Sequence, residues 1–299
     1  HGLPHFRKAN FTGTFPFAKL ELVDPDVPIR VTLEAFSPFM PLNDKDSSIP
    51  VAIFTYSFEN TGTEEAVATV YGNLTNVIGD SEVDDRVNEV RKEDGAVGLF
   101  LTNKKIEVSS PRYGSMALAT NCSNASVWPR WKDASLSKFW EAIALSDEFP
   151  LEGEGRSDTG TVAASFMARP GEKATVTFVL SWHFPNFEHY WGKKGEGGKA
   201  ATWRNFYATI WKDAWDVVLY TTSNLRRLRE ETKRFHDTLF SSTLPVHVLD
   251  AVSSQLSTLR TTTCLRLEDG TFYGFEGSSN TGGCCEGSCT HVWNYAQAL

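Results

Sequence analysis

The spacing of apolar residues changes once along this chain, and that change restricts the folds it can adopt. Up to about residue 186, apolar and polar residues alternate in short runs, such as Val51 to Phe58, separated by Gly, Pro and Asn. From Asp213 to Phe240 the apolar residues recur at steps of three and four. Alternation indicates half-buried strands, and the longer step indicates one apolar face of a helix. A β domain followed by helices is therefore expected.

The strand pattern recurs throughout the first part of the chain. Many short strands between turn residues are typical of an antiparallel β-sandwich. The segment from Trp128 to Leu145 lacks this alternation and is expected to be a loop with a short helix. The predicted strands are Ile29–Phe36, Val51–Phe58, Val67–Tyr71, Val97–Leu101, Ser115–Thr120, Thr161–Phe166 and Lys173–Trp182.

Helix signals follow residue 213. After the helix over Asp213–Phe240, the hydroxyls of Ser241-Ser242-Thr243 predict an N-cap and Pro245 fits the first turn of a second helix, which should end near Thr261. Arg266 to Phe275 reads as a hairpin that turns at its Asp-Gly pair, 269–270. Residues 290–299 read as the start of a third helix, so we expect the chain to be a fragment.

These signals divide the chain into three parts. We expect an N-terminal β-sandwich domain over residues 1–190, a loop and linker helix over 191–243, and the start of a helical domain over 244–299. A β domain followed by paired helices with loops between them predicts a sandwich joined to an α-helical barrel.

Charge and hydropathy exclude several partners. The net charge is −8, and no stretch concentrates Lys and Arg with interleaved aromatic residues except the helix face around Arg226, Arg227 and Arg229. A nucleic acid is therefore not expected as a partner. No run approaches the ~20 apolar residues of a membrane span, which leaves peripheral membrane contact open. Five cysteines, four of them after residue 260, do not form a disulfide framework. Reduced thiols favour the cytoplasm, although the compartment stays open.

Glu276 stands in the most informative local sequence. It lies among glycines and aromatic residues in Tyr273-Gly274-Phe275-Glu276-Gly277, at the end of the predicted hairpin. Glycines allow a close approach to a ligand, aromatic faces suit a sugar ring, and a carboxylate between them can attack an anomeric carbon. This is glycosidase-like chemistry, although an ordinary exposed loop carboxylate is the alternative.

Other polar residues have weaker signals. Thiolates and imidazole are ligands of zinc, so the cysteines at 284–289 and His291 could bind it. Their spacing lacks paired Cys-x-x-Cys motifs, so buried thiols or a disulfide are the alternatives to a metal site. His291 could hydrogen-bond a sugar hydroxyl or be structural. Asp44 and Asp46 are expected in a solvated turn, and no role is assigned to His183–Asn186. The candidate zinc ligands are Cys284, Cys285, Cys289 and His291.

Three stretches form longer motifs. They are LEAFSPFMPLN at 33–43 with DSSIPVA at 46–52, SWHFPN at 181–186, and GFEG at 274–277 leading to HVWNY at 291–295. Together they resemble glycoside hydrolase family 116, which contains the non-lysosomal glucosylceramidases, or bile-acid β-glucosidases, and bacterial β-glucosidases. The likeness spans most of the chain.

The resemblance implies a fold and a mechanism. It implies an N-terminal β-sandwich against an (α/α)6 barrel, truncated here, and a retaining β-glycosidase that needs no cofactor. Glu276 takes the position of the nucleophile, and the acid/base Asp is expected beyond Leu299. His291 and Trp293 are the candidate substrate-binding residues, for a carbohydrate or glycolipid substrate. The alternatives are a zinc-thiolate glycosidase using the 284–289 cysteines, or a non-catalytic carbohydrate-binding module.

Overall fold

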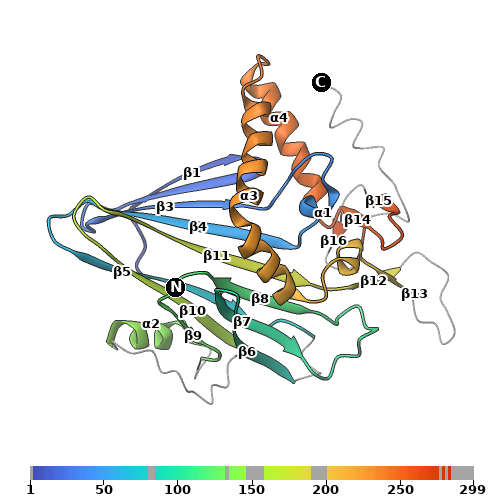
Figure 1. Cartoon of the computed structure of the whole chain (residues 1–299), viewed down its shortest axis with the longest axis horizontal. Coiled ribbons are helices and arrows are strands. Elements are labelled where there is room, and N and C mark those ends of the chain that lie inside the picture. The colour runs from blue at the N-terminus through green and yellow to red at the C-terminus, as the bar shows by residue number, and fades with distance from the viewer. Residues whose placement is uncertain are drawn as a thin grey trace.

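The β-rich part of the protein is built in layers (Figure 1). The computed structural model describes residues 3–79, 85–131, 135–145, 158–189, 201–275, 278–279 and 282–283. An eight-stranded antiparallel sheet carries the long helix α3, Ala214–Phe240, on one face and a three-stranded sheet on the other. The antiparallel β-sandwich expected from the sequence therefore agrees with the structure.

The large sheet has the order β1-β2-β3-β4-β11-β8-β7-β6 and the small sheet the order β5-β10-β9. The large sheet comprises β1 Lys8–Thr14, β2 Phe17–Val23, β3 Ile29–Phe36, β4 Val51–Asn60, β6 Arg86–Glu93, β7 Ala96–Asn103, β8 Ser115–Thr120 and β11 Lys173–His183. The small sheet comprises β5 Ala66–Thr75, β9 Ala125–Trp128 and β10 Thr159–Ala168.

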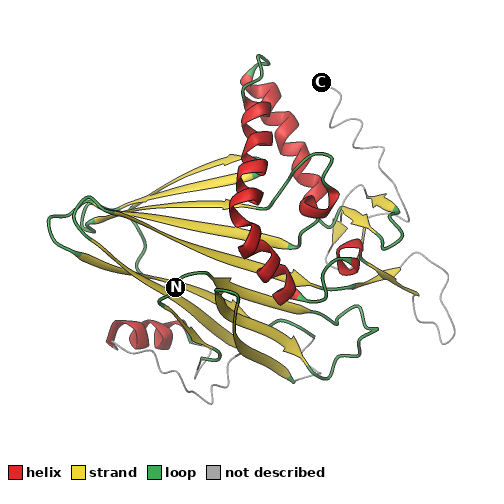
Figure 2. Cartoon of the chain, in the orientation of Figure 1, coloured by secondary structure: helices red, strands yellow, loops and turns green. Residues whose placement is uncertain are grey.

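The remaining elements described in the structure are helices, 3-10 turns and short strands (Figure 2). The helices are α1 Asp44–Ser47, α2 Leu136–Leu145 and α4 Val246–Leu256, with 3-10 turns η2 Phe206–Thr209 and η3 Ser257–Arg260. The short strands are β12 Asn186–His189, β13 Ala201–Arg204, β14 Cys264–Arg266, β15 Phe272–Gly274, β16 Ser278–Ser279 and β17 Gly282–Gly283.

Side-chain alternation separates two cores. On β4, Ile53 faces the core beneath α3 while Phe58 faces the core shared with the small sheet, and β11 divides Val179 and Phe178 in the same way. Successive strand residues point to opposite faces, so one strand can serve both cores. Small residues line the sheet under the helix and let it approach closely; these fully buried alanines are Ala96, Ala117 and Ala119.

The end of β11 fixes the start of α3. Ser181 Oγ donates to the carbonyl of Ala214 at 2.7 Å, and His183 Nε2 lies 2.8 Å from the carbonyl oxygen of Trp211. Burial lowers the pKa of His183 despite that bond, so the ring is neutral and donates from Nε2. The side chain of Asp213 caps the helix by accepting from the Asp216 N–H at 2.8 Å. His183, to which the sequence assigned no role, is thus a structural anchor together with Ser181.

The helix predictions are confirmed in part. The helix predicted over Asp213–Phe240 is α3, and the short helix predicted before Leu145 is α2. The predicted hydroxyl N-cap of the next helix is wrong. Pro245, whose side chain has no hydrogen-bond acceptor, occupies the N-cap of α4, and Ser241 terminates α3.

The expected barrel stays a prediction. After residue 243 the described residues form α4, η3 and short hairpins, and the helix predicted over 290–299 lies outside them. The proposed division at residues 190 and 243 also stays a prediction.

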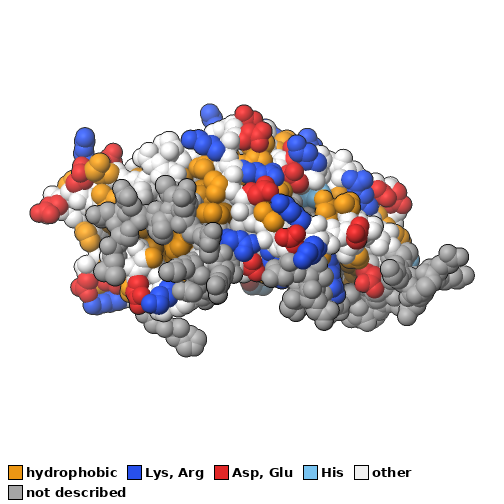
Figure 3. Space-filling view, turned by 90° about the horizontal axis from the view of Figure 1, so that it is seen from below, with side chains coloured by type: hydrophobic (Ala, Val, Ile, Leu, Met, Phe, Trp, Pro, Cys, Tyr) orange, Lys and Arg blue, Asp and Glu red, His pale blue; other side chains and the backbone are white. Residues whose placement is uncertain are grey.

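Charged side chains of both signs are interleaved on the face that Figure 3 shows, between small apolar patches. Acidic and basic groups do not segregate there. Among the helices described in the structure, none has the length and hydropathy needed to span a bilayer.

Candidate functional site

The predicted site residues lie outside the part of the chain that the structure describes. This holds for the candidate nucleophile and for the candidate substrate-binding and zinc-binding residues, Glu276, His291, Trp293, Cys284, Cys285 and Cys289. What the structure does describe is the hairpin that leads to residue 276 and the groups that hold this hairpin. These groups define the support of the candidate site.

The hairpin forms where the sequence predicts it. β14 pairs with β15 in antiparallel register, Cys264 opposite Gly274, and Leu267 N–H donates to the Thr271 carbonyl at 2.8 Å. The turn contains Asp269 and Gly270, and Gly270 has a φ of +88° that favours glycine. The predicted turn at the Asp-Gly pair is therefore confirmed.

Phe275, the residue before Glu276, is fixed in the interior. Its exposed fraction is 1%, it belongs to a small core with Leu265 and Leu267, and its N–H donates to the carbonyl of Thr263 at 2.9 Å. A buried aromatic with its backbone amide satisfied cannot shift without losing packing and a hydrogen bond. The path of the chain up to residue 275 is thereby set.

The β12–β13 pair and the residue after it hold the hairpin from one side. Leu267 forms an isolated antiparallel bridge with Asn205, and Glu268 N–H donates to the Arg204 carbonyl at 3.0 Å. The ring of Trp203 stacks on Tyr273, with centroids 5.3 Å apart. The hairpin thus extends the β12–β13 region through backbone bonds and stacked rings.

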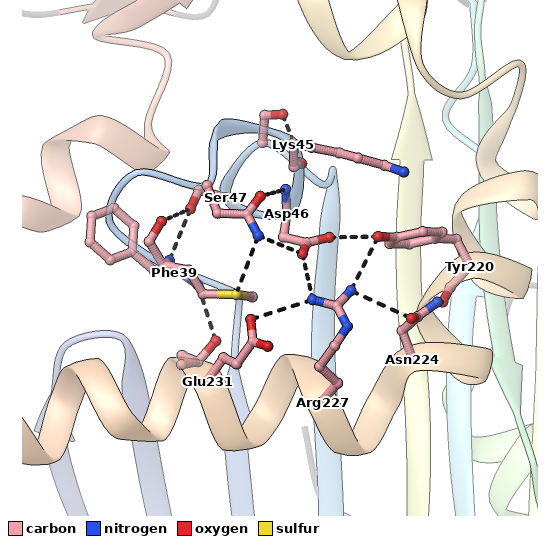
Figure 4. A network of polar contacts seen from close by, with 12 residues as sticks. Phe39, Lys45, Asp46, Ser47, Tyr220, Asn224, Arg227 and Glu231 are labelled. Atoms are coloured by element: carbon pink, nitrogen blue, oxygen red, sulfur yellow. Dashed lines mark hydrogen bonds and ion pairs between the residues drawn. The ribbon is translucent and has the colours of Figure 1, made fainter.

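A polar network joins the motif loop, residues 37–50, to α3 (Figure 4). Asp46 is 3% exposed and lies at its centre. Its Oδ1 accepts from the Tyr220 hydroxyl at 2.7 Å, and its Oδ2 accepts from Arg227 at 2.7 Å and from Asn43 at 2.9 Å. The expectation that Asp46 lies in a solvated turn is therefore wrong, since α3 covers it and supplies two of its donors.

The network keeps Asp46 ionised. Burial opposes its charge, but hydrogen bonds from Arg227, Tyr220 and Asn43 outweigh burial and hold its pKa below the ordinary value. The same bond to Asp46 raises the pKa of Arg227. A carboxylate with a donor on both oxygens is poorly suited to proton transfer, so Asp46 is a structural group.

Further contacts run between the same loop and α3. Phe39 N–H donates to Thr232 Oγ1 at 3.2 Å. Arg229 makes a two-point contact with Glu34 on β3, at 2.6 and 2.9 Å. Arg227 and Arg229 thus meet carboxylates of the β domain, and Arg226 pairs with Glu230 of α3 itself, which is why that basic cluster is not a free positive patch.

One sequence signal indicates the position of Asp46. Asn43 precedes Asp46 by three residues and its side chain accepts from the Asp46 N–H at 3.1 Å, as in a helix-capping pair at the start of α1. The long-range partners on α3 have no such local signal. Among the residues that the structure describes, no group of three His, Cys, Asp or Glu side chains is placed to bind a metal.

The described architecture defines a class: a β-sandwich that carries a long helix on one face and fixes a hairpin against residues 203–205. Residues 3–228 match the sequence model described as beta-glucosidase 2, glycosyl-hydrolase family 116 N-terminal domain. The chain belongs to that family.

Three solved structures show a distant likeness. A structure described as a kojibiose phosphorylase from the human microbiome is 9% identical with a TM-score of 0.35, over 75% of this chain and 23% of its own. A polysaccharide lyase is 14% identical with a TM-score of 0.33, over 56% of this chain and 21% of its own. A family 36 α-galactosidase from Geobacillus stearothermophilus, in complex with stachyose, is 12% identical with a TM-score of 0.29, over 60% and 26%. The chain thus spans about a quarter of the length of these proteins, with 23% for the first.

Proposed function

We propose that the protein containing this chain is a retaining β-glycosidase of the β-glucosidase type, with Glu276 as its nucleophile. The observation that carries the proposal is the family 116 match over residues 3–228. A second observation supports the choice of residue. Phe275 is locked in the core and Gly277 follows Glu276, so the carboxylate comes directly after an anchored hairpin.

The proposed reaction proceeds in two displacements. The Glu276 carboxylate attacks the anomeric carbon, forming a glycosyl ester while the bond to the leaving oxygen breaks and an acid protonates that oxygen. The conjugate base then takes a proton from water, whose oxygen cleaves the ester and restores Glu276. We place this acid/base, an Asp, C-terminal to Leu299, and a retaining pair stands ~5–5.5 Å apart. His291 and Trp293 are proposed to contact the sugar.

The test is Glu276→Gln in the protein that contains this chain. An amide is a poor nucleophile, so hydrolysis of an aryl β-glucoside should fall by at least about a thousandfold. Azide should restore part of the turnover and give an α-glycosyl azide, because the small anion attacks the anomeric carbon directly and inverts its β configuration.

The matched control is Glu268→Gln, an exposed carboxylate on the same hairpin. Its kinetics should equal those of the unchanged protein. Hydrolysis by Glu276→Gln at the unchanged rate would refute the assignment.

A further inference from the structure

Arg260 reaches back from η3 into the motif loop, residues 37–50. Its guanidinium donates to the carbonyl of Ile49 at 2.9 Å, and to the carbonyl of Ser47 and the hydroxyl of Ser37. The acceptors come from both ends of the loop, and Ile49 is fully buried. Arg260, just before the hairpin, thus bonds to residues at both ends of the motif loop.

The charge of Arg260 ties its side chain to these three acceptors. Burial lowers the pKa of Arg260 to about 10, so the guanidinium is still charged at neutral pH. A buried charge is costly unless its donors are satisfied, and bonds from a charged donor are the stronger kind. The three oxygens offset that cost only when the guanidinium keeps its place, which fixes its position more tightly than an apolar contact would.

A short hydrogen-bonded path connects Arg260 to the end of the hairpin. Thr261 accepts through its carbonyl from the Cys264 N–H at 3.1 Å, which sets the start of β14. Thr263 in turn accepts from the Phe275 N–H at 2.9 Å. The residues between Arg260 and β14 therefore bond directly to the residue that precedes Glu276.

A second arginine holds the other end of β14. Arg266 pairs with Asp44 of α1 at 2.9 Å and lies over the ring of Phe206, 3.6 Å from its centroid. Arg260 and Arg266 thus attach the first strand of the hairpin to the same loop, and Asp46 attaches that loop to α3. The three contacts form one continuous connection from α3 to residue 275.

We propose that Arg260 is a positioning residue: its contacts with Ser37, Ser47 and Ile49 hold the hairpin in the place from which residue 276 acts on the sugar. This inference rests on the proposed glycosidase function. Arg260 itself does not touch the substrate. It acts through Thr263 and Phe275, and misplacing a nucleophile by about 1 Å can cost about a hundredfold in rate.

The experiment compares Arg260→Met and Arg260→Lys with Arg229→Met in the protein that contains this chain. Arg229 is the matched control, because its guanidinium also joins two elements but contacts Glu34 rather than the hairpin. Three quantities are measured for each variant: kcat and KM on an aryl β-glucoside, amide hydrogen exchange of residues 264–274, and the melting temperature.

For Arg260→Met we expect faster exchange in residues 264–274, and kcat roughly tenfold to a hundredfold lower with KM changed less than about threefold. Arg260→Lys should have hairpin exchange rates and a kcat between those of Arg260→Met and the unchanged protein, because a single ammonium replaces only part of the forked guanidinium. Arg229→Met should lower the melting temperature while hairpin exchange and kcat stay within about twofold of the unchanged protein.

Several results overturn the inference. Unchanged hairpin exchange in Arg260→Met would show that Arg260 does not hold the hairpin, whatever the protein catalyses. Faster exchange with unchanged kcat would show that the hairpin's position does not govern the reaction. If Arg260→Met fails to fold, Arg260→Lys supplies the same comparison. If the protein without any substitution has no glycosidase activity, the proposed function is refuted. Hydrogen exchange in Arg260→Met would still test whether Arg260 holds the hairpin.

Discussion

Asp46 stays ionised under a helix because the fold brings donors to both of its oxygens. Two come from α3, Tyr220 and Arg227, and one comes from its own loop, Asn43. Such a group stabilises the fold only while the set is complete, since a buried charge without partners is costly. The same argument applies to Arg260, whose acceptors are backbone and hydroxyl oxygens.

Asp46→Asn tests this at the residue scale. The amide loses the charge and offers N–H groups where donors already stand, so the free energy of unfolding should fall by about 2–3 kcal/mol. Urea unfolding at neutral pH measures it. Asp44→Asn, two residues away and exposed, is the control and should change stability much less. Equal losses in the two variants would contradict the structural role of Asp46.

The pKa of Asp46 gives this loss a pH dependence. Because the folded-state pKa lies below the ordinary value, the stabilising contribution is fully present above pH ~4, the pKa of an unfolded Asp. It disappears as the pH falls through the lower folded-state pKa. The difference between Asp46→Asn and the unchanged protein should therefore shrink below pH ~4.

The hairpin turn is tested at the scale of the element. Gly270 has a φ of +88°, so Gly270→Ala should lower stability by about 1 kcal/mol and speed amide exchange in β15. Gly270→Asn is the matched control, because Asn tolerates positive φ better than Ala does. Equal effects of Ala and Asn would mean that backbone strain at residue 270 is not the cause.

Most elements that were predicted from the sequence have one clear period. The bounds of β3 and β8 match the predicted strands, and α3 begins and ends where its apolar spacing does. Strands β1, β2 and β6 were missed, although β2 alternates Leu20 and Leu22 with Lys19 and Glu21. β1 is exposed along nearly its whole length and β6 carries charges, so neither has a buried face that leaves a pattern.

The candidate site also has parts that the local sequence predicts and parts that it does not. Local sequence was enough to predict the turn at Asp269-Gly270, because that turn depends on residues close in the chain. The assignment of Glu276 rests on equally local residues and stays a prediction. The partners of Asp46 and Arg260 are 181 and 211 residues away, in Arg227 and Ile49, and no local pattern encodes such contacts. Sequence reasoning therefore placed Asp46 in solvent, where the structure buries it.

At the scale of the whole molecule, the β domain serves as a support for the hairpin. Its sheet carries α3, α3 holds the motif loop through Asp46, and the loop holds β14 through Arg260 and Arg266. This order of contacts gives the N-terminal family 116 domain a purpose in the proposed reaction. It holds Phe275, the residue before the proposed nucleophile, on the framework of the sheet and α3.

Covalent trapping tests the central claim, that Glu276 bonds to the sugar, most directly. A 2-deoxy-2-fluoro-β-glucoside with a good leaving group should label the protein that contains this chain, and peptide mapping by mass spectrometry should place one sugar on Glu276. The Glu276→Gln variant should take up no label. A sugar found instead on Cys284, Cys285 or Cys289, with Glu276 unmodified, would contradict the account and favour a thiolate nucleophile.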